Sequence, residues 1–107
     1  MWIRLNRPEA MNSLTPEVLL GIDQALNEAQ ERADVITVVL TGTGRAFCAG
    51  GDFEEMAKFS EMNSLDRKNF LYRNVHRIPL ALERMDKPVI AAINGAARGA
   101  GLDMALM

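Results

Sequence analysis

The sequence predicts a single α/β domain whose central strands run parallel. Two apolar runs without alternation, residues 35–40 and 89–93, are typical of strands buried on both faces of a sheet. The segments between and after these runs have the spacing of amphipathic helices. Strands that alternate with helices favour a parallel sheet with right-handed crossovers. We therefore expect the order strand, helix, strand, helix, strand, helix, without internal repeats.

The first strand and the first helix follow from local signals. Residues 1–5 are short and apolar, and the turn residues 6–9 end them, which predicts an edge or hairpin strand. Thr15-Pro16-Glu17 combines a capping hydroxyl, a proline at the first helical position and an acid in the first turn. A helix therefore begins there and packs on the sheet through apolar residues at helical spacing: Val18, Leu19, Ile22, Leu26 and Ala29.

The later elements are punctuated by glycine and proline. Residues 41–51 are rich in glycine and small residues, which predicts a loop between a strand and a helix. Residues 64–85 form a longer amphipathic stretch, for which we expect a helix with a kink or break near Pro79. Asn94-Gly95 turns the chain out of the second buried strand, and Gly99-Ala100-Gly101 leads into a final helix.

Composition excludes several classes of protein. A length of 107 residues with 49% apolar content fits one compact domain, and a net charge of -2 argues against nucleic-acid binding. No apolar stretch approaches the roughly 20 residues that cross a bilayer, so we expect a soluble protein without a membrane partner. The single Cys48 cannot form an internal disulfide and no signal segment is apparent, which favours the cytoplasm.

Two loops rich in small residues, 46–52 and 94–103, each follow a buried strand and precede a helix. Ligands of such sheets bind beyond the carboxyl ends of the strands, so both loops are expected to face one crevice. One unpaired amide from each loop, aimed at one carbonyl oxygen, would form an oxyanion hole. Tight helix–sheet packing and phosphate binding are the alternatives, although neither loop has a phosphate-binding glycine pattern.

Three sequence blocks point to a known family. Residues 6–14 (NRPEAMNSL), 44–52 (GRAFCAGGD) and 87–95 (KPVIAAING) resemble the enoyl-CoA hydratase/isomerase family, the crotonase superfamily, in order and spacing. The resemblance covers nearly the whole chain. It implies a crotonase-like spiral of ββα units with largely parallel central strands. Residues 1–107 would be one incomplete domain, without the later part of the sheet and the C-terminal helices through which family members trimerise.

The resemblance also implies the site. The amides of Gly51 and Ala100 would hold the thioester oxygen; family members often have glycine at the second place. Asp103 matches a position that is a catalytic Glu in hydratases and an Asp in some isomerases. Its alternative role is to complement the helix dipole as a first-turn acid. The residues expected to line the coenzyme A site are Ala10, Met11, Ala49, Gly50, Gly51 and Asp52.

Other reactive side chains are expected to be structural. His76 is expected to pack on a helix face, and Cys48 has no activating partner in the sequence. Arg98 could pair with a coenzyme A phosphate or cover the surface.

The resulting hypothesis is an acyl-CoA-binding enzyme of hydratase or isomerase type that moves a proton near the thioester carbonyl. It needs no metal and no cofactor beyond the coenzyme A of its substrate. As in complete family members, a homo-oligomer, trimer or hexamer, is expected. Family hydratases use a second acid beyond residue 107. The alternative is therefore a truncated, inactive chain that binds only a partner or coenzyme A.

Overall fold

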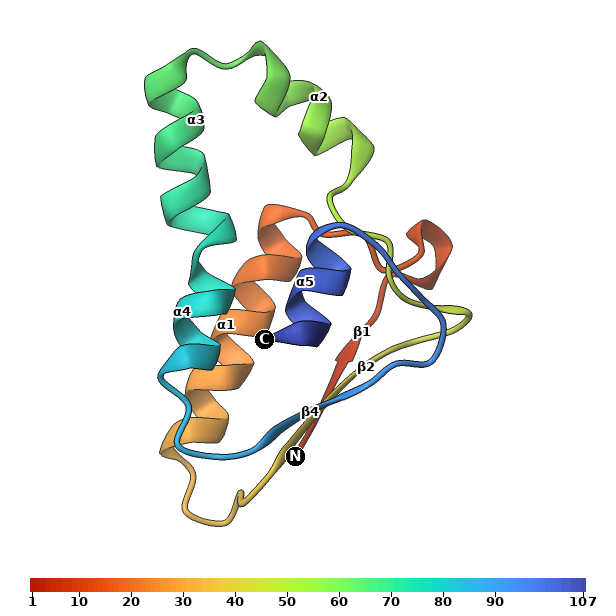
Figure 1. The fold of residues 1–107 in the computed structure, drawn as a ribbon, viewed down its shortest axis with the longest axis vertical. Helices are drawn as coiled ribbons and strands as arrows, with labels where there is room; N and C mark the ends of the chain where they lie inside the picture. Colours follow the sequence, from red (N-terminus) through yellow and green to blue (C-terminus); the bar gives the residue numbers. More distant parts are fainter.

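The computed structural model describes all of residues 1–107 and contains two small parallel sheets with helices packed beside them (Figure 1). The larger sheet has the strand order β1-β2-β4, and the smaller one pairs β3 with β5. None of the helices combines the length and apolar content that crossing a bilayer requires. The elements in chain order are β1 (Trp2–Leu5), η1 (Pro8–Ala10), α1 (Pro16–Glu31), β2 (Val38–Gly42), β3 (Ala46–Cys48), α2 (Phe53–Glu61), α3 (Ser64–Phe70), η2 (Leu71–Val75), α4 (Arg77–Glu83), β4 (Val89–Ala92), β5 (Ala96–Ala97) and α5 (Ala100–Leu106).

The predicted parallel sheet is confirmed. β2 is its central strand and pairs in parallel with β1 and with β4, with Leu40 opposite both Ile3 and Ala91. β1 is an edge strand, not half of a hairpin, and its residues alternate between exposed and buried. β4 is less covered than the sequence suggests, because Ile90 is half exposed.

The second sheet was not apparent in the sequence. Residues 46–48 and 96–97, which we expected to be loop and turn, form β3 and β5. Asn94 connects the two sheets: its Oδ1 accepts from the Gly42 amide at 3.0 Å, and its Nδ2 donates to the Ala46 carbonyl at 3.1 Å. Each later strand of the large sheet is therefore followed by a short strand and then a helix, the ββα repeat that the family resemblance implies.

Helix α1 begins as predicted. Pro16 is its first residue, and the Thr15 hydroxyl accepts a hydrogen bond from the Val18 amide at 3.3 Å. Its buried face contributes Leu19, Ile22, Leu26 and Ala29 to the core. Lys87 secures the other end of the helix by donating to the carbonyls of Ala29 and Arg32 at 2.6 and 2.7 Å.

The expected break in residues 64–85 lies just before Pro79. α3 passes into the π-helical turn η2, in which the His76 amide donates to the Leu71 carbonyl, five residues earlier. α4 then starts at Arg77, so Pro79 occupies its first turn. Proline is tolerated in a first turn, but its ring would crowd the carbonyl four residues earlier, that of Val75, in a continuous α-helix. The wider π turn removes this conflict.

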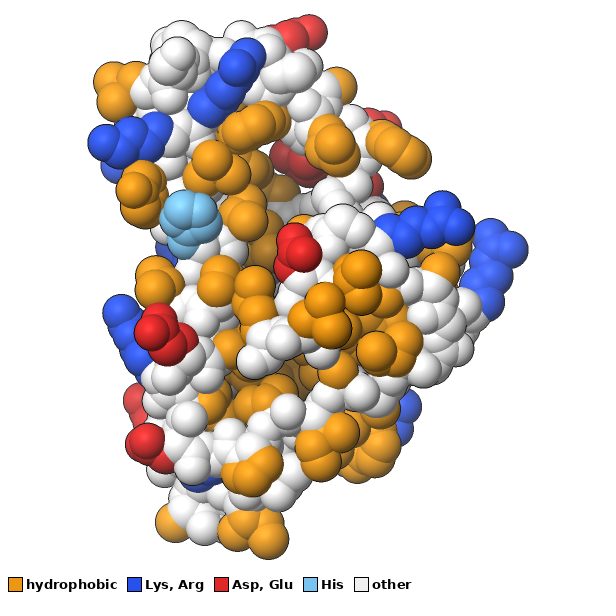
Figure 2. Space-filling model, in the orientation of Figure 1, with side chains coloured by type: hydrophobic (Ala, Val, Ile, Leu, Met, Phe, Trp, Pro, Cys, Tyr) orange, Lys and Arg blue, Asp and Glu red, His pale blue; other side chains and the backbone are white.

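Helices α2 and α3 form an arch that stands away from the rest of the molecule (Figure 1). No residue of either helix is buried, whereas α1 and α5 carry buried side chains. The arch leaves a hollow bordered by hydrophobic side chains (Figure 2). The candidate site lies there.

Candidate active site

The two glycine-rich loops meet at one place, because β3 and β5 are paired. Ala46 lies opposite Ala96 and Cys48 opposite Ala97, and the Arg98 amide donates to the Cys48 carbonyl at 3.0 Å. Gly50, at φ +93°, has no side chain and so allows residues 98–100 to approach its backbone closely. A Cβ at this position would lie 2.8 Å from the Arg98 carbonyl oxygen and 3.6 Å from the Ala100 nitrogen. The structure thus brings the residues around position 50 next to position 100.

The direction of the Gly51 N–H follows from peptide geometry. The Gly50 carbonyl accepts from the Leu14 amide at 2.7 Å, and the Asp52 amide donates to the Leu14 carbonyl at 3.1 Å. The carbonyl and N–H of one trans peptide point in opposite directions. Since the chain contains no cis peptide bond, the Gly51 N–H points away from the Leu14 backbone. It donates no hydrogen bond within the chain.

The Ala100 N–H is also free. Ala100 is the first residue of α5, and its amide donates no hydrogen bond within the chain. The Gly101 amide donates to the Arg98 carbonyl, and the Leu102 amide donates to the Gly99 carbonyl. The first amides of a helix have no acceptor within it and carry partial positive charge. Because only the backbone is involved, the methyl group of Ala100 does not interfere with donation.

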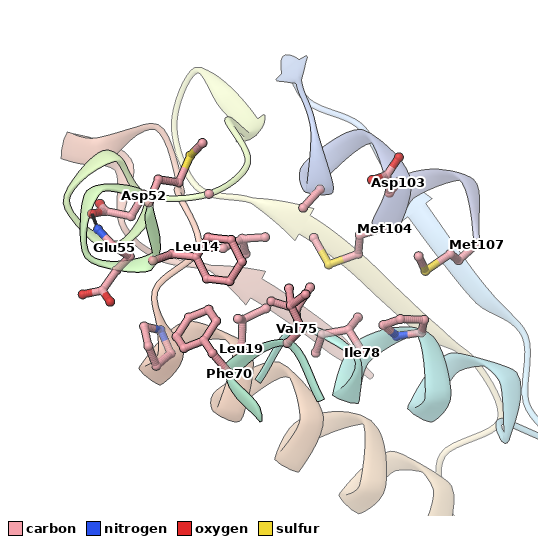
Figure 3. Close-up of a pocket in the computed structure, with 17 residues that line it drawn as sticks. Leu14, Leu19, Asp52, Glu55, Phe70, Val75, Ile78, Asp103, Met104 and Met107 are labelled. Carbon is pink, nitrogen blue, oxygen red and sulfur yellow. Dashed lines mark hydrogen bonds between the residues drawn. The ribbon is translucent and has the colours of Figure 1, made fainter. Parts of the chain in front are cut away.

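Gly51 and Ala100 both line a cavity of about 290 Å³ beneath the arch (Figure 3). Its walls are mostly apolar and come from six helices or helical turns, so it suits a hydrocarbon chain. The apolar lining consists of Leu14, Pro16, Leu19, Met56, Phe59, Phe70, Leu71, Val75, Ile78, Pro79, Met104 and Met107.

Three carboxylates border the cavity, and they differ in their partners. Asp52 accepts hydrogen bonds from Ser13, Arg7 and two amides, and Glu55 pairs with Lys58 at 3.1 Å. Asp103, in the first turn of α5, is exposed and has neither an ion pair nor a side-chain hydrogen bond. Asp103 is therefore the one cavity carboxylate without an ion-pair or hydrogen-bond partner for its side chain.

The residues expected to line a coenzyme A site form a second group beside the amides. The Ala49 amide donates to the Met11 carbonyl at 3.0 Å, which places Ala49 next to Ala10 and Met11. Of the six expected residues, Gly51 and Asp52 also line the cavity, whereas Ala10, Met11, Ala49 and Gly50 lie outside it. The group therefore touches the cavity only through Gly51 and Asp52.

Buried polar groups hold this region in place. Asn12, only 1% exposed, donates to the carbonyls of Thr43 and Ala46 at 3.0 and 2.8 Å and accepts from the Arg7 amide. Met11 and Asn12 have left-handed backbones, at φ 52° and 55°, so the turn is strained. The Asn12 hydrogen bonds hold that turn against β3.

The ionisation of two side chains reflects their surroundings. Burial on its own would raise the pKa of Asp52, but hydrogen bonds from the Glu55 amide, Ser13, Arg7 and the Glu54 amide outweigh it, and the net pKa is lowered. Burial raises the pKa of the Cys48 thiol, so it stays protonated, as expected of a packing residue. His76 stacks edge-on against Tyr72, with ring centroids 4.9 Å apart, and lies outside the cavity.

Sequence reasoning missed the cavity walls and the polar contacts of Ser13. One wall comes from the apolar face of residues 64–85. The periodicity of that stretch predicts a helix but does not show that the face covers a hollow. Ser13 lies in a matched sequence block, but its contacts with Arg7 and Asp52 depend on the folded chain.

Comparison with known proteins supports the resemblance. A family model described as enoyl-CoA hydratase/isomerase matches residues 1–107. YngF of Bacillus subtilis is 41% identical over 105 residues, and the short-chain-enoyl-CoA hydratase of Clostridium acetobutylicum is 39% identical over 107 residues. Each alignment covers 97% of this chain and 39% of the relative, so the chain spans about two fifths of their length.

A solved structure shows the same fold. The enoyl-CoA hydratase from Bacillus anthracis superposes with a TM-score of 0.81 at 38% identity, covering 98% of this chain and 40% of that one. Relatives occur in more than one compartment: the mitochondrial enoyl-CoA hydratase of Pongo abelii is 41% identical over 105 residues. These similarities therefore do not decide where in the cell this chain works.

Proposed function

The chain belongs to the enoyl-CoA hydratase/isomerase family, and from that premise we propose that it binds an acyl-CoA and polarises its thioester through the amides of Gly51 and Ala100. The observation that carries the proposal is that these two free N–H groups border one apolar cavity. A thioester oxygen placed between them accepts two hydrogen bonds. The acyl chain then extends into the cavity.

The two amides favour charge development on that oxygen. Removal of a proton next to the thioester carbonyl, or addition of water across a conjugated double bond, places negative charge there as an enolate. Fixed donors bind the charged oxygen more strongly than the neutral one, and one such donor contributes on the order of 3 kcal/mol. Because both donors are backbone groups, replacing a side chain does not remove them.

Asp103 is the proposed acid/base. It lies three residues after Ala100, in the first turn of the same helix, and borders the same cavity. A carboxylate so close to the bound carbonyl can take a proton from, or return one to, the neighbouring acyl carbons. Coenzyme A is part of the substrate, and its binding is assigned to residues 10–11 and 49–52 beside the cavity.

A second candidate function is binding of coenzyme A without catalysis. It is favoured by the presence of only one unpaired carboxylate at the cavity, where family hydratases use two acids. In a complete protein, the second acid, the rest of the sheet and a trimer or hexamer interface would come from the part of the relatives that this chain does not span.

The test combines turnover with binding. Crotonyl-CoA hydration is measured spectrophotometrically and coenzyme A binding by calorimetry, for the parent chain and for Asp103→Asn. We expect turnover to fall by at least about 100-fold in Asp103→Asn, with affinity changed less than about threefold. Asp66→Asn is the matched control, since Asp66 is also a first-turn acid of a seven-residue helix.

The outcomes separate the candidates. Unchanged turnover in Asp103→Asn would mean that Asp103 only stabilises helix α5. Coenzyme A binding by the parent without any turnover favours the second candidate. An absence of both binding and turnover would refute the proposed site.

A further inference from the structure

A polar network next to Gly51 joins Arg7, Ser13 and the side chain of Asp52. Nη1 of Arg7 donates to the Ser13 carbonyl at 3.0 Å, to Ser13 Oγ at 3.1 Å and to Oδ2 of Asp52 at 3.4 Å. Ser13 Oγ donates to the same Oδ2 at 3.1 Å. Ser13 is buried, and the Asp52 side chain is only 17% exposed. The proposed reaction uses none of these contacts.

The two oxygens of Asp52 have separate tasks. Oδ1 accepts from the amides of Glu54 and Glu55 at 3.0 and 3.3 Å and so caps helix α2. Oδ2 accepts hydrogen bonds from Ser13 Oγ and Arg7 Nη1. One carboxylate therefore joins the segment before α1, the loop after β3 and the start of α2, immediately after Gly51.

Gly51 needs such a restraint because its backbone is intrinsically loose. It follows another glycine, and two successive glycines allow more φ/ψ rotation than any other pair. The two backbone hydrogen bonds to Leu14 fix the position of the segment and the mean direction of the Gly51 N–H. A small rotation of the Gly50–Gly51 peptide would nevertheless turn its N–H out of line, and oxyanion stabilisation depends on donors that are oriented before charge develops.

We propose that Arg7, Ser13 and Oδ2 of Asp52 act as positioning residues that fix the Gly51 N–H toward the thioester oxygen. We refer to them as the Gly51 clamp. This inference rests on the proposed function for its purpose. Its physical content, an ordered Gly51 amide, can be measured without any ligand.

Two variants remove the clamp in different ways. Ser13→Ala deletes the hydroxyl that joins Arg7 to Asp52. Asp52→Asn keeps an oxygen that can cap α2, since asparagine is an equally good N-cap, but replaces the acceptor Oδ2 with an NH₂ group. Ser60→Ala is the matched control, because that exposed hydroxyl bonds only the Ala57 carbonyl within its own helix.

The first measurement is ¹⁵N relaxation of the ligand-free chain. We expect the Gly51 amide order parameter to fall from about 0.85 to below about 0.6 in both clamp variants, while that of Ala100 and the Ser60→Ala spectrum stay unchanged. A Gly51 amide that stays as ordered as in the parent in the variants that fold would overturn the clamp. Asp52→Asn keeps the test decisive if Ser13→Ala does not fold.

The second measurement is isotope-edited infrared spectroscopy of bound [1-¹³C]butyryl-CoA. The parent should lower the thioester carbonyl stretch relative to the free thioester. Ser13→Ala, which leaves the residues of the proposed coenzyme A site unchanged, should lose at least half of that shift while still binding. If the clamp residues only stabilised the fold, the carbonyl band of the bound thioester would stay at the frequency seen with the parent. If the parent itself fails to bind or to move the band, the proposed function fails, and the relaxation data still decide whether the clamp exists.

Discussion

Replacing Gly101 with alanine should separate helix α5 from strand β3. Gly101 is buried in the first turn of α5, against Cys48. A Cβ at this position would lie 2.4 Å from the Cys48 carbonyl oxygen and 2.8 Å from the Cys48 Cβ, whereas ordinary contact begins at 3.4 Å. These two atoms are a backbone oxygen and the first side-chain carbon, which cannot rotate away, so the helix must retreat by about 1 Å.

The cost can be worked from that distance. Overpacking a well-filled site destabilises by roughly 1–3 kcal/mol, and the better helix propensity of alanine returns up to about 1 kcal/mol. Because the clash is with backbone, the upper half of that cost applies, and the net loss is roughly 1–2 kcal/mol. This loss lowers the melting temperature by about 5–15 °C in a chain of this size. The Ala100 amide moves with the helix, and a 1 Å misplacement at a reacting centre can cost about 100-fold in rate.

The assay is thermal and urea unfolding, together with kcat/KM for crotonyl-CoA. Gly21→Ala is the control, since Gly21 is exposed in the middle of α1 and a Cβ there meets nothing within 4 Å. It should stabilise the chain by roughly 0.5–1 kcal/mol. If Gly101→Ala raised the melting temperature as much as Gly21→Ala, the close approach of α5 to β3 would be wrong.

Three further perturbations test the framework around the site. Asn12→Ala removes two hydrogen bonds to carbonyls and should lower the free energy of unfolding, measured in urea, by roughly 2–4 kcal/mol. The exposed Asn27→Ala should leave that free energy nearly unchanged, and a loss below about 1 kcal/mol for Asn12→Ala would contradict the expectation. Lys87→Met should lower the free energy of unfolding by roughly 1–3 kcal/mol, because the carbonyls at the end of α1 lose their donor. The exposed Lys68→Met should lower it by less than about 0.5 kcal/mol. Equal losses would refute the role of Lys87 at the end of α1. The lowered pKa of Asp52 means that its stabilising contribution is complete above the ordinary aspartate value near 3.8 and is lost as pH falls through the lowered value. Acid titration followed by amide exchange in residues 49–55 should therefore show loosening in that range, and an identical profile in Asp52→Asn would rule out Asp52 as the cause.

Local signals in the sequence determined the large sheet and the first helix. The β-branched run before Gly42 predicts β2, and Thr15-Pro16 predicts the start of α1, because burial pattern and capping act over a few neighbouring residues. The same holds for the two glycine-rich loops, whose amides could be proposed as donors before their positions were known. The family resemblance added the particular residues expected to act, Gly51, Ala100 and Asp103.

Only the tertiary structure decided where those amides point and what lies beside them. β3 and β5 are too short and too poor in pattern to be predicted, because their pairing joins residues about 50 positions apart. The direction of the Gly51 N–H follows from a hydrogen bond between Leu14 and Gly50, and the cavity follows from how α2 and α3 arch over α1 and α5. Sequence periodicity records which face of an element is apolar, whereas the partner of that face is fixed by long-range packing.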